Sequence, residues 1–191
     1  TDAEDEIVVC VDGDDDAVRF VLDSWTQQYA HTKMIKVYQR KLGKDFAAQK
    51  NSVIENSTGD YIFHIDADEY PNEILLQQLK QILEINDVDL VWVPRVNTIE
   101  GMEHQHIQKW GWRVTENGWV NYPDYQARVF RRDKNIRWTR PLHEHIVGCK
   151  TQSHLPPNED LSLYHPKTIE KQEKQNMFYN QNFSAEMNVR R

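Results

Sequence analysis

The sequence predicts an α/β fold of three layers with a mostly parallel central sheet. Over the first hundred residues, short apolar runs typical of buried strands alternate with amphipathic helical patterns. Two of the strand patterns end in acidic turns, at Asp12 and at Asp66. Alternating strands and helices indicate crossover connections between parallel strands, whose carboxyl ends share one edge of the sheet. We therefore expect both acidic turns near one ligand cleft.

The elements expected in the first half follow from apolar spacing and turn residues. Asp14 to Asp16 suit the N-terminus of the helix after the first strand, because carboxylates are favourable there. That helix carries Val18, Val21, Leu22 and Trp25 on one face, and the pattern from Glu73 to Ile85 is strongly amphipathic. The other expected elements are strands at 6–11, 34–38, 60–65 and 89–96 and a helix at 44–56.

The second half changes in composition. Residues 97–123 are rich in Trp, Gly, His and Asn, which indicates a long loop or irregular hairpin. The remaining expected elements are strands at 125–131, 136–138 and within 141–148, a short apolar run at 161–164, and a polar helix at 169–182.

Length and composition fit one domain. The 191 residues are 39% hydrophobic and 10% aromatic, enough for a core, and no apolar run has the length of a membrane span. The net charge of -7 argues against a nucleic-acid partner. Cys10 and Cys149 lack metal-ligand spacing, so we expect two reduced thiols in a cytoplasmic protein without a signal peptide.

The most informative segment is the acidic end of one predicted strand. The apolar run Tyr61–Ile65 stops at Asp66, Asp68 and Glu69. Two aspartates separated by one residue repel each other unless a positive charge lies between them. Mg²⁺ and Mn²⁺ prefer oxygen ligands and are often shared with substrate phosphates, so the segment indicates a metal-assisted site. The alternative is a solvated turn in which Asp68 or Asn72 caps the next helix.

Four segments, in this order, resemble the family 2 glycosyltransferases with the GT-A (Rossmann-like) fold, most closely the lipopolysaccharide-core glucosyltransferase branch. They are Glu6–Asp16, Lys44–Asn51, the Asp-x-Asp-Glu strand end Gly59–Glu69, and Gln126–Arg132 followed by Leu142–Glu144. Asp14 stands where the family has Ser, and Lys50 where it has Arg. The family's opening strand has no counterpart before Glu6, so either the chain is a fragment of a longer protein or the alignment is shifted by one strand–helix unit.

The resemblance implies a single domain over 1–191, in which 1–96 bind the nucleotide sugar and 97–191, with the C-terminal helix, form the acceptor side. It implies a metal-dependent hexosyltransferase that uses Mn²⁺ or Mg²⁺. The donor would be a nucleoside-diphosphate sugar, most simply a UDP-sugar, and the acceptor a glycan hydroxyl, with inversion at the transferred sugar.

The resemblance also assigns donor and metal residues. Asp68 would ligate the metal directly, Asp66 would contact the ribose or reach the metal through water, and His165 would be a third ligand or a diphosphate contact. The other donor-side residues would be Asp12 at the nucleobase or ribose, Lys50 at the diphosphate, Asn51 bracing the loop, and Arg128. Plain structural readings remain open, with Asp12 capping a turn and Lys50 a solvated helix lysine.

Glu144 is the expected general base, because an inverting transfer needs a carboxylate to take the acceptor proton. His143 is the second candidate or orients Glu144, and Asp124 is the third. Glu144 could instead form a structural ion pair with Arg128 or Arg140. Three tryptophans either stack on an acceptor sugar or pack in loops, namely Trp110, Trp112 and Trp119.

Two other functions use the same residues. A metal-dependent phosphohydrolase would combine the carboxylates with His104-x-His106 and His143-x-His145, since alternate residues on a strand share a face. A non-catalytic carbohydrate-binding module would keep the fold without turnover.

Overall fold

The computed structural model describes residues 4–32 and 34–188 and divides the chain into two compact units. Unit 1 comprises Thr1–Ile62, Arg132–Gly148 and Phe183–Arg191, and unit 2 comprises Phe63–Arg131 and Cys149–Asn182. The units are interleaved along the sequence. The division expected from the sequence, in which 1–96 bind the nucleotide sugar and 97–191 form the acceptor side, stays a prediction.

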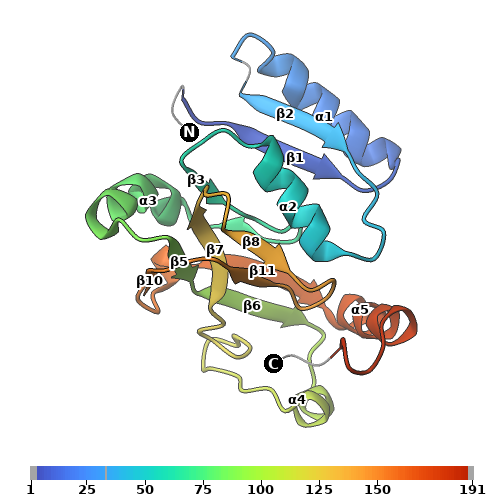
Figure 1. Ribbon diagram of the computed structural model, residues 1–191. Coiled ribbons are helices and arrows are strands. Elements are labelled where there is room, and N and C mark those ends of the chain that lie inside the picture. Colours follow the sequence, from blue (N-terminus) through green and yellow to red (C-terminus); the bar gives the residue numbers. More distant parts are fainter. Residues whose placement is uncertain (1–3, 33, 189–191) are drawn as a thin grey trace. The chain divides into compact units, whose positions relative to one another are not determined.

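Unit 1 is built on a pair of parallel strands. β1 (Ile7–Val11) pairs with β2 (Ile35–Gln39), with Ile7 opposite Ile35. Helix α1 (Asp16–Gln28) packs on β2, and helix α2 (Phe46–Asn56) packs on β1 (Figure 1). Helix α2 also packs on β8 (Arg137–Thr139), which forms an antiparallel hairpin with β9 (His145–Val147).

Unit 2 contains two sheets of mixed direction. In the first, β5 (Leu90–Val93) pairs in parallel with β10 (Gln152–His154) and antiparallel with β7 (Gln126–Arg131). β3 (Tyr61–Phe63), whose last residue belongs to unit 2, follows β7 in the strand order. In the second sheet, β11 (Leu163–Thr168) lies between β4 (Tyr70–Pro71), antiparallel, and β6 (Arg95–Glu100), parallel (Figure 1).

Three helices complete unit 2. They are α3 (Glu73–Asn86), α4 (His104–Trp110) and α5 (Ile169–Asn182), and a short 3₁₀ turn covers Glu159–Leu161. Strand β5 reads Leu-Val-Trp-Val, a continuous apolar run, and three of its four side chains are buried, as expected for a strand covered on both faces. The core of unit 2 therefore forms around β5 and β7, with Leu75 of α3 fully buried.

Helix starts follow the predicted capping chemistry. Asp15 accepts hydrogen bonds from the amides of Ala17 and Val18, and Asp45 accepts one from Ala48. Asn72 accepts from the amide of Ile74 at the start of α3. Of the two residues that could cap this helix, Asn72 does so, which leaves the Asp68 carboxylate for other contacts.

Three segments differ from the sequence-based expectation. The strand expected at 89–96 is interrupted at Pro94, which has no amide hydrogen to donate, so β5 and β6 enter different sheets. The irregular region expected at 97–123 includes most of β6 and all of α4, which ends at Gly111 in a left-handed conformation. The short run at 161–164 is instead β11, which continues through His165 to Thr168.

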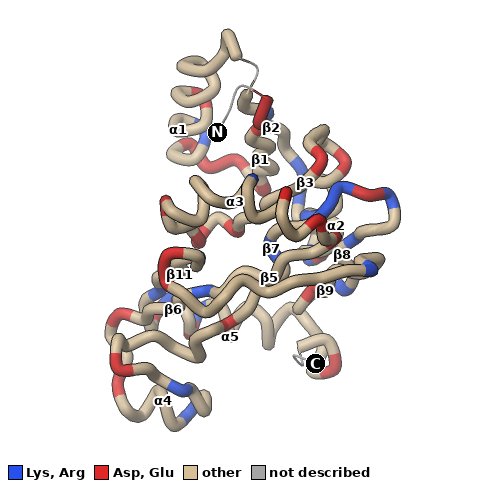
Figure 2. Tube along the Cα trace, turned by 90° about the vertical axis from the view of Figure 1, so that its left-hand side faces the viewer, with Lys and Arg blue, Asp and Glu red and all other residues tan. Residues whose placement is uncertain are grey.

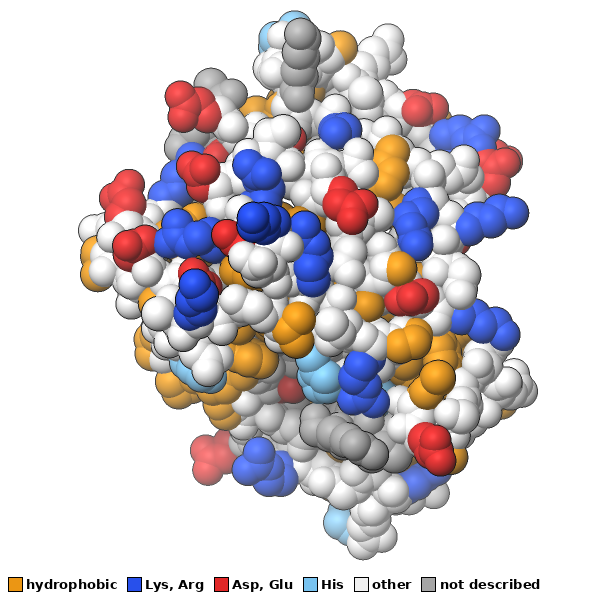
Figure 3. Space-filling view, in the orientation of Figure 1, with side chains coloured by type: hydrophobic (Ala, Val, Ile, Leu, Met, Phe, Trp, Pro, Cys, Tyr) orange, Lys and Arg blue, Asp and Glu red, His pale blue; other side chains and the backbone are white. Residues whose placement is uncertain are grey.

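The α/β class is confirmed, while the strand pairings are more mixed than a mostly parallel sheet. Both cysteines, Cys10 and Cys149, are free thiols. Acidic and basic positions occur in both units (Figure 2), and their side chains are interspersed on the face seen in Figure 3. Within 4–32 and 34–188, no helix has the length and apolar composition needed to cross a membrane.

Gly148 should be the glycine of unit 1 that tolerates substitution least. Its φ is +90°, and a Cβ there would overlap the backbone carbonyl of Asn135. We expect Gly148→Ala to lower the free energy of unfolding by about 3 kcal/mol or more, measured by urea denaturation. Gly118→Ala, at φ +79° with open space around the new carbon, should cost only about 1 kcal/mol. Equal losses in the two variants would contradict the role of the Asn135 carbonyl.

Candidate functional site

The acidic segment after β3 is organised around a buried carboxylate. The side chain of Glu69 is 0% exposed, and its Oε1 accepts from Arg95 Nη1 at 2.6 Å and from Arg128 Nη2 at 2.7 Å. A buried carboxylate is stable only when it is paired and hydrogen-bonded, and the two guanidinium groups provide both. Glu69 is therefore a structural member of the acidic cluster.

Arg128 also fixes the first aspartate of the cluster. Its Nη2 lies 2.5 Å from Asp66 Oδ2, and only 3% of its side chain is exposed. Burial alone would lower the pKa of Arg128, but the carboxylates of Asp66 and Glu69 outweigh burial and raise it. The other oxygen of Asp66 lies 3.2 Å from His64 Nε2. Arg128, predicted on the donor side, thus fixes the position of Asp66.

Arg95 extends the network towards the second sheet. Its Nε and Nη2 donate to Asp124 Oδ2 at 3.1 and 2.6 Å. Asn97 Nδ2 donates to the same oxygen at 2.9 Å and to the carbonyl of Val120 at 3.3 Å. Asp124, the third candidate for the base, is therefore engaged as an acceptor within this network.

These contacts determine which ring nitrogen of His165 carries hydrogen. Because the Asn97 amide nitrogen faces two acceptors, its Oδ1 is the atom that faces His165 Nδ1, at 2.7 Å. An amide oxygen only accepts, so Nδ1 is the donor. In the neutral ring, Nε2 then presents a lone pair, and it lies 3.4 Å from Asp68 Oδ2.

Asp68, like Asp66, is a partly exposed acceptor of the cluster. Its Oδ2 is contacted by His165 Nε2 and by Lys171 Nζ, the latter at 3.1 Å. When Nε2 of His165 also carries hydrogen, it donates to Asp68, and this hydrogen bond, helped by Lys171, holds the pKa of the Asp68 carboxyl far below its usual range although burial opposes this. The side chain stays 31% exposed, so an incoming ligand can reach it.

The Asp68–His165 pair fits a divalent cation by the chemistry of its donor atoms. A carboxylate oxygen and an imidazole nitrogen face each other, and the far nitrogen of the ring donates to an amide oxygen, which is the usual support of a metal-binding histidine. In the part of the chain that the structure describes, no group of three or more His, Cys, Asp or Glu side chains could hold a metal ion. Two protein ligands suffice only where substrate oxygens and water complete the coordination.

Unit 1 contains a second set of predicted residues. Lys50 Nζ lies 2.6 Å from Glu144 Oε1, with side chains 11% and 15% exposed. The same Nζ lies 4.5 Å from the centre of the Trp138 ring, a cation–π contact. Glu144 thus forms an ion pair with Lys50, whereas the expected structural partners were Arg128 and Arg140.

Asn51 braces this set. Its side-chain amide donates to the carbonyl of Trp138 and accepts from the amide of Trp138, both at 2.9 Å. These bonds fix β8 to α2, which also carries Lys50. The helix therefore presents Lys50 and Asn51 to one strand.

The remaining candidates of unit 1 have local partners. His143 has a left-handed backbone, with φ of 51°, and its Nε2 lies 3.2 Å from Asn188 Oδ1. Asp12 accepts from the amide of Leu42 at 2.9 Å and so supports the loop after β2, in line with its turn-capping reading. The expectation that Asp12 and Asp66 share one cleft stays a prediction.

The phosphohydrolase hypothesis predicts His104 and His106 on one face of a strand, and this prediction is wrong. His104 and His106 lie in helix α4, where alternate residues do not share a face. The ring of His106 accepts from the amide of Glu103 and stacks on Trp110 at 5.6 Å. Trp110, in α4, also packs on Trp112 at 4.6 Å, and stacking of either ring on an acceptor sugar stays a prediction.

The chain resembles known proteins both in sequence and in structure. The family model "Glycosyl transferase family 2" matches residues 1–154. Among solved structures, S. aureus TarS 1-349 in complex with UDP-GlcNAc is 16% identical and has a TM-score of 0.55, covering 85% of this chain and 49% of that one. The complex of S. aureus TarS 1-349 with UDP is 14% identical, with a TM-score of 0.53 and coverages of 94% and 57%.

The chain thus spans about half the length of the solved structures that it matches. A search of curated proteins finds no match. At these identities the structural likeness establishes the fold, and the finer resemblance to the lipopolysaccharide-core branch stays a prediction.

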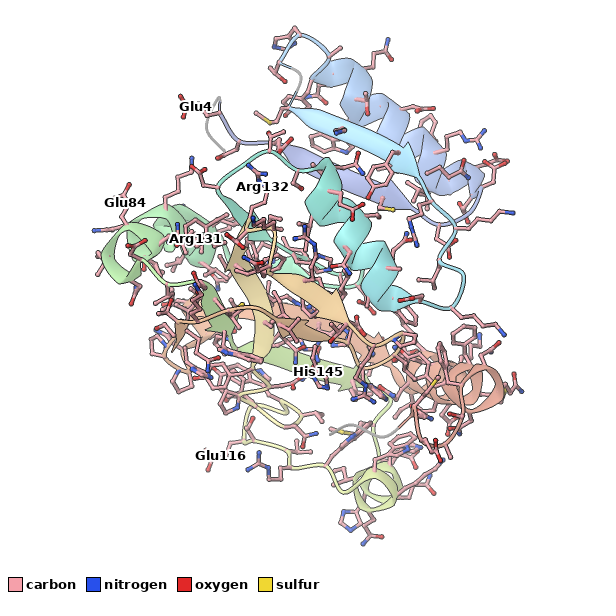
Figure 4. The ribbon with its side chains drawn as sticks, viewed as in Figure 1. Glu4, Glu84, Glu116, Arg131, Arg132 and His145 are labelled. Carbon is pink, nitrogen blue, oxygen red and sulfur yellow. The ribbon has the colours of Figure 1, made fainter. Side chains whose placement is uncertain are left out.

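Removal of Glu69 should destabilise the protein strongly. Glu69→Ala would leave the buried guanidinium groups of Arg95 and Arg128 without their shared carboxylate, and we expect a loss of about 3–5 kcal/mol in the free energy of unfolding. Glu84→Ala, on the exposed outer side of α3 (Figure 4), should change it by less than about 0.5 kcal/mol. Urea denaturation of both variants tests this, and a loss below 1 kcal/mol for Glu69→Ala would contradict the role given to Glu69.

Proposed function

Because the chain belongs to glycosyl transferase family 2 and has the GT-A fold, we propose that it transfers a sugar from a nucleoside-diphosphate sugar to a hydroxyl group of a glycan. The complexes of TarS with UDP and UDP-GlcNAc make a UDP-sugar the first donor to test. The single observation that carries this proposal is the Asp68–His165 pair, two acceptor atoms 3.4 Å apart at the acidic end of a strand.

The donor side needs positive charge because the departing nucleoside diphosphate gains negative charge as its bond to the sugar breaks. A bound Mn²⁺ or Mg²⁺ supplies Lewis-acid charge for this step. Asp68 and His165 would hold the cation, while Asp66, fixed by Arg128, would accept from a ribose hydroxyl or from a water on the metal. Asp12 is proposed at the nucleobase or ribose.

Glu144 is the proposed general base. Its carboxylate would take the proton of the acceptor hydroxyl as the acceptor oxygen bonds to the anomeric carbon. The bond from that carbon to the diphosphate breaks on the opposite side, and the leaving diphosphate keeps the electron pair, so the configuration inverts. The ammonium of Lys50, which also contacts the Trp138 ring, supports this role because it fixes the position of the Glu144 carboxylate.

Lys50 and His143 have supporting parts in this proposal. The resemblance predicts Lys50 at the diphosphate, but its 2.6 Å contact favours a role beside Glu144, where it lies next to Asn51. His143, in the same turn as Glu144, remains the second candidate base. Neither alternative function, hydrolysis of phosphate esters or binding of carbohydrate without turnover, gains a supporting contact among the described residues.

Asp68→Ala should abolish the effect of Mn²⁺ on nucleotide binding. For the wild type, we expect UDP to bind more tightly with Mn²⁺ than without, and a ligand at a hundred times its Kd raises stability by about 2.7 kcal/mol. In Asp68→Ala the Kd for UDP should be the same with and without Mn²⁺. Calorimetry and thermal shift with a panel of nucleotide sugars check this, and a retained Mn²⁺ effect would rule out Asp68 as a ligand.

Glu144→Gln should separate binding from turnover. Loss of the general base should reduce kcat by about 10²- to 10⁴-fold, while the Kd for UDP stays close to that of the wild type. Glu116→Gln, an exposed carboxylate labelled in Figure 4, is the matched control and should keep full activity. If Glu144→Gln turns over at the wild-type rate, another residue is the base; phosphate release from simple esters would instead favour the hydrolase.

A further inference from the structure

Lys171 contacts the acidic cluster of Asp66, Asp68 and Glu69, and the proposed function gives this lysine no role. It lies in the first turn of α5, where Thr168 Oγ1 accepts from its amide at 3.2 Å. From there its side chain reaches Asp68, 103 residues earlier in the chain, with Nζ 3.1 Å from Oδ2.

The position of Lys171 is unfavourable for a structural lysine. The first turn of a helix carries partial positive charge, so a lysine there needs nearby anions, which for Lys171 are Glu170 of the same turn and Asp68. Its side chain is 52% exposed, and exposed ion pairs contribute little to folding. The Lys171–Asp68 contact is therefore weak enough to be exchanged for another partner.

Lys171 and His165 compete for one atom. Both contact Asp68 Oδ2, Lys171 from the exposed side and His165 from within the strand. A divalent cation held between Asp68 Oδ2 and His165 Nε2 would lie close to the ammonium, and two cations beside one oxygen repel each other. Occupation of the pair by such a cation thus requires the ammonium to move away.

The second partner of the ammonium would be the donor itself. An ammonium that leaves Asp68 keeps its charge and can donate to an oxygen of a phosphate group. A diphosphate that shares its oxygens with a cation on Asp68 would lie within the reach of this lysine.

Resting on the proposed function, we propose that Lys171 is an exchangeable counter-cation: it neutralises Asp68 before the donor arrives, and it binds the diphosphate once a divalent cation has replaced it on Asp68. Lys171 therefore opposes binding of the metal alone and favours binding of the metal with a nucleotide. These opposite effects distinguish it from a lysine with a merely structural role.

The test is Lys171→Met in the full chain, with two titrations. Electron paramagnetic resonance of Mn²⁺ alone should give a Kd about threefold or more below that of the wild type, because a repelling charge has been removed. Calorimetry with UDP at saturating Mn²⁺ should give a Kd about tenfold above that of the wild type, because a charge-assisted phosphate contact has been lost.

Two variants serve as controls. Lys174→Met removes the same charge one turn further along α5 and should leave both constants within about twofold of the wild type. Lys171→Arg keeps the charge and should restore both constants towards their wild-type values. Circular dichroism of all variants verifies that α5 is intact.

The outcomes separate this inference from the proposed function. Wild-type protein that binds neither Mn²⁺ nor UDP overturns the proposed function and the inference together. Wild-type protein that binds both, with the two constants of Lys171→Met unchanged or shifted in the same direction, overturns the inference alone. Opposite shifts, absent from Lys174→Met, support it.

Discussion

The acidic cluster of unit 2 depends on one buried charge, the carboxylate of Glu69 between the guanidinium groups of Arg95 and Arg128. Two arginines in a protein interior are costly unless a fixed anion offsets them. Each arginine also contacts a further carboxylate: the Nη2 of Arg128 that binds Glu69 also reaches Asp66, and Nε and Nη2 of Arg95 donate to Asp124. Glu69 fixes the two arginines, and the arginines in turn orient Asp66 and Asp124.

The influence of that contact extends across the second sheet of unit 2. Asp124 orients the amide of Asn97, and the Asn97 oxygen sets the tautomer of His165. Every member of this relay lies on or beside strands whose pairing fixes its position, since β6 carries Arg95 and Asn97 and β11 carries His165. The candidate metal pair is thus prearranged before any ligand arrives, which reduces the cost of ordering it on binding.

Local chemistry was readable from the sequence, and long-range pairing was not. Asp15 and Asn72 cap helices because a short polar side chain before an apolar periodic run has few other uses, and the apolar run before Asp66 is recognisable as a strand end. Pro94 could have divided the strand expected at 89–96, since proline cannot continue a sheet ladder. Helix α4 lacks the apolar periodicity that signals a helix, so composition alone suggested a loop.

The partners of Glu69 and Glu144 lie 26 and 94 residues away, and nothing local selects Arg95 or Lys50 from the other basic residues. A charged residue inside an apolar run, as Arg95 is, was nonetheless a usable signal of a buried ion pair.

The use of arginine in the buried network has a consequence for the acid–base behaviour of the candidate site. A guanidinium group keeps its proton at every pH at which proteins stay folded, unlike lysine or histidine in the same place. The positive half of the framework that carries Asp66 and Asp124 is consequently constant from mildly acidic to strongly alkaline solution. A bell-shaped dependence of the rate on pH, measured across neutrality, would then report the groups that transfer protons during turnover. Loss of charge on the two arginines would not contribute to it.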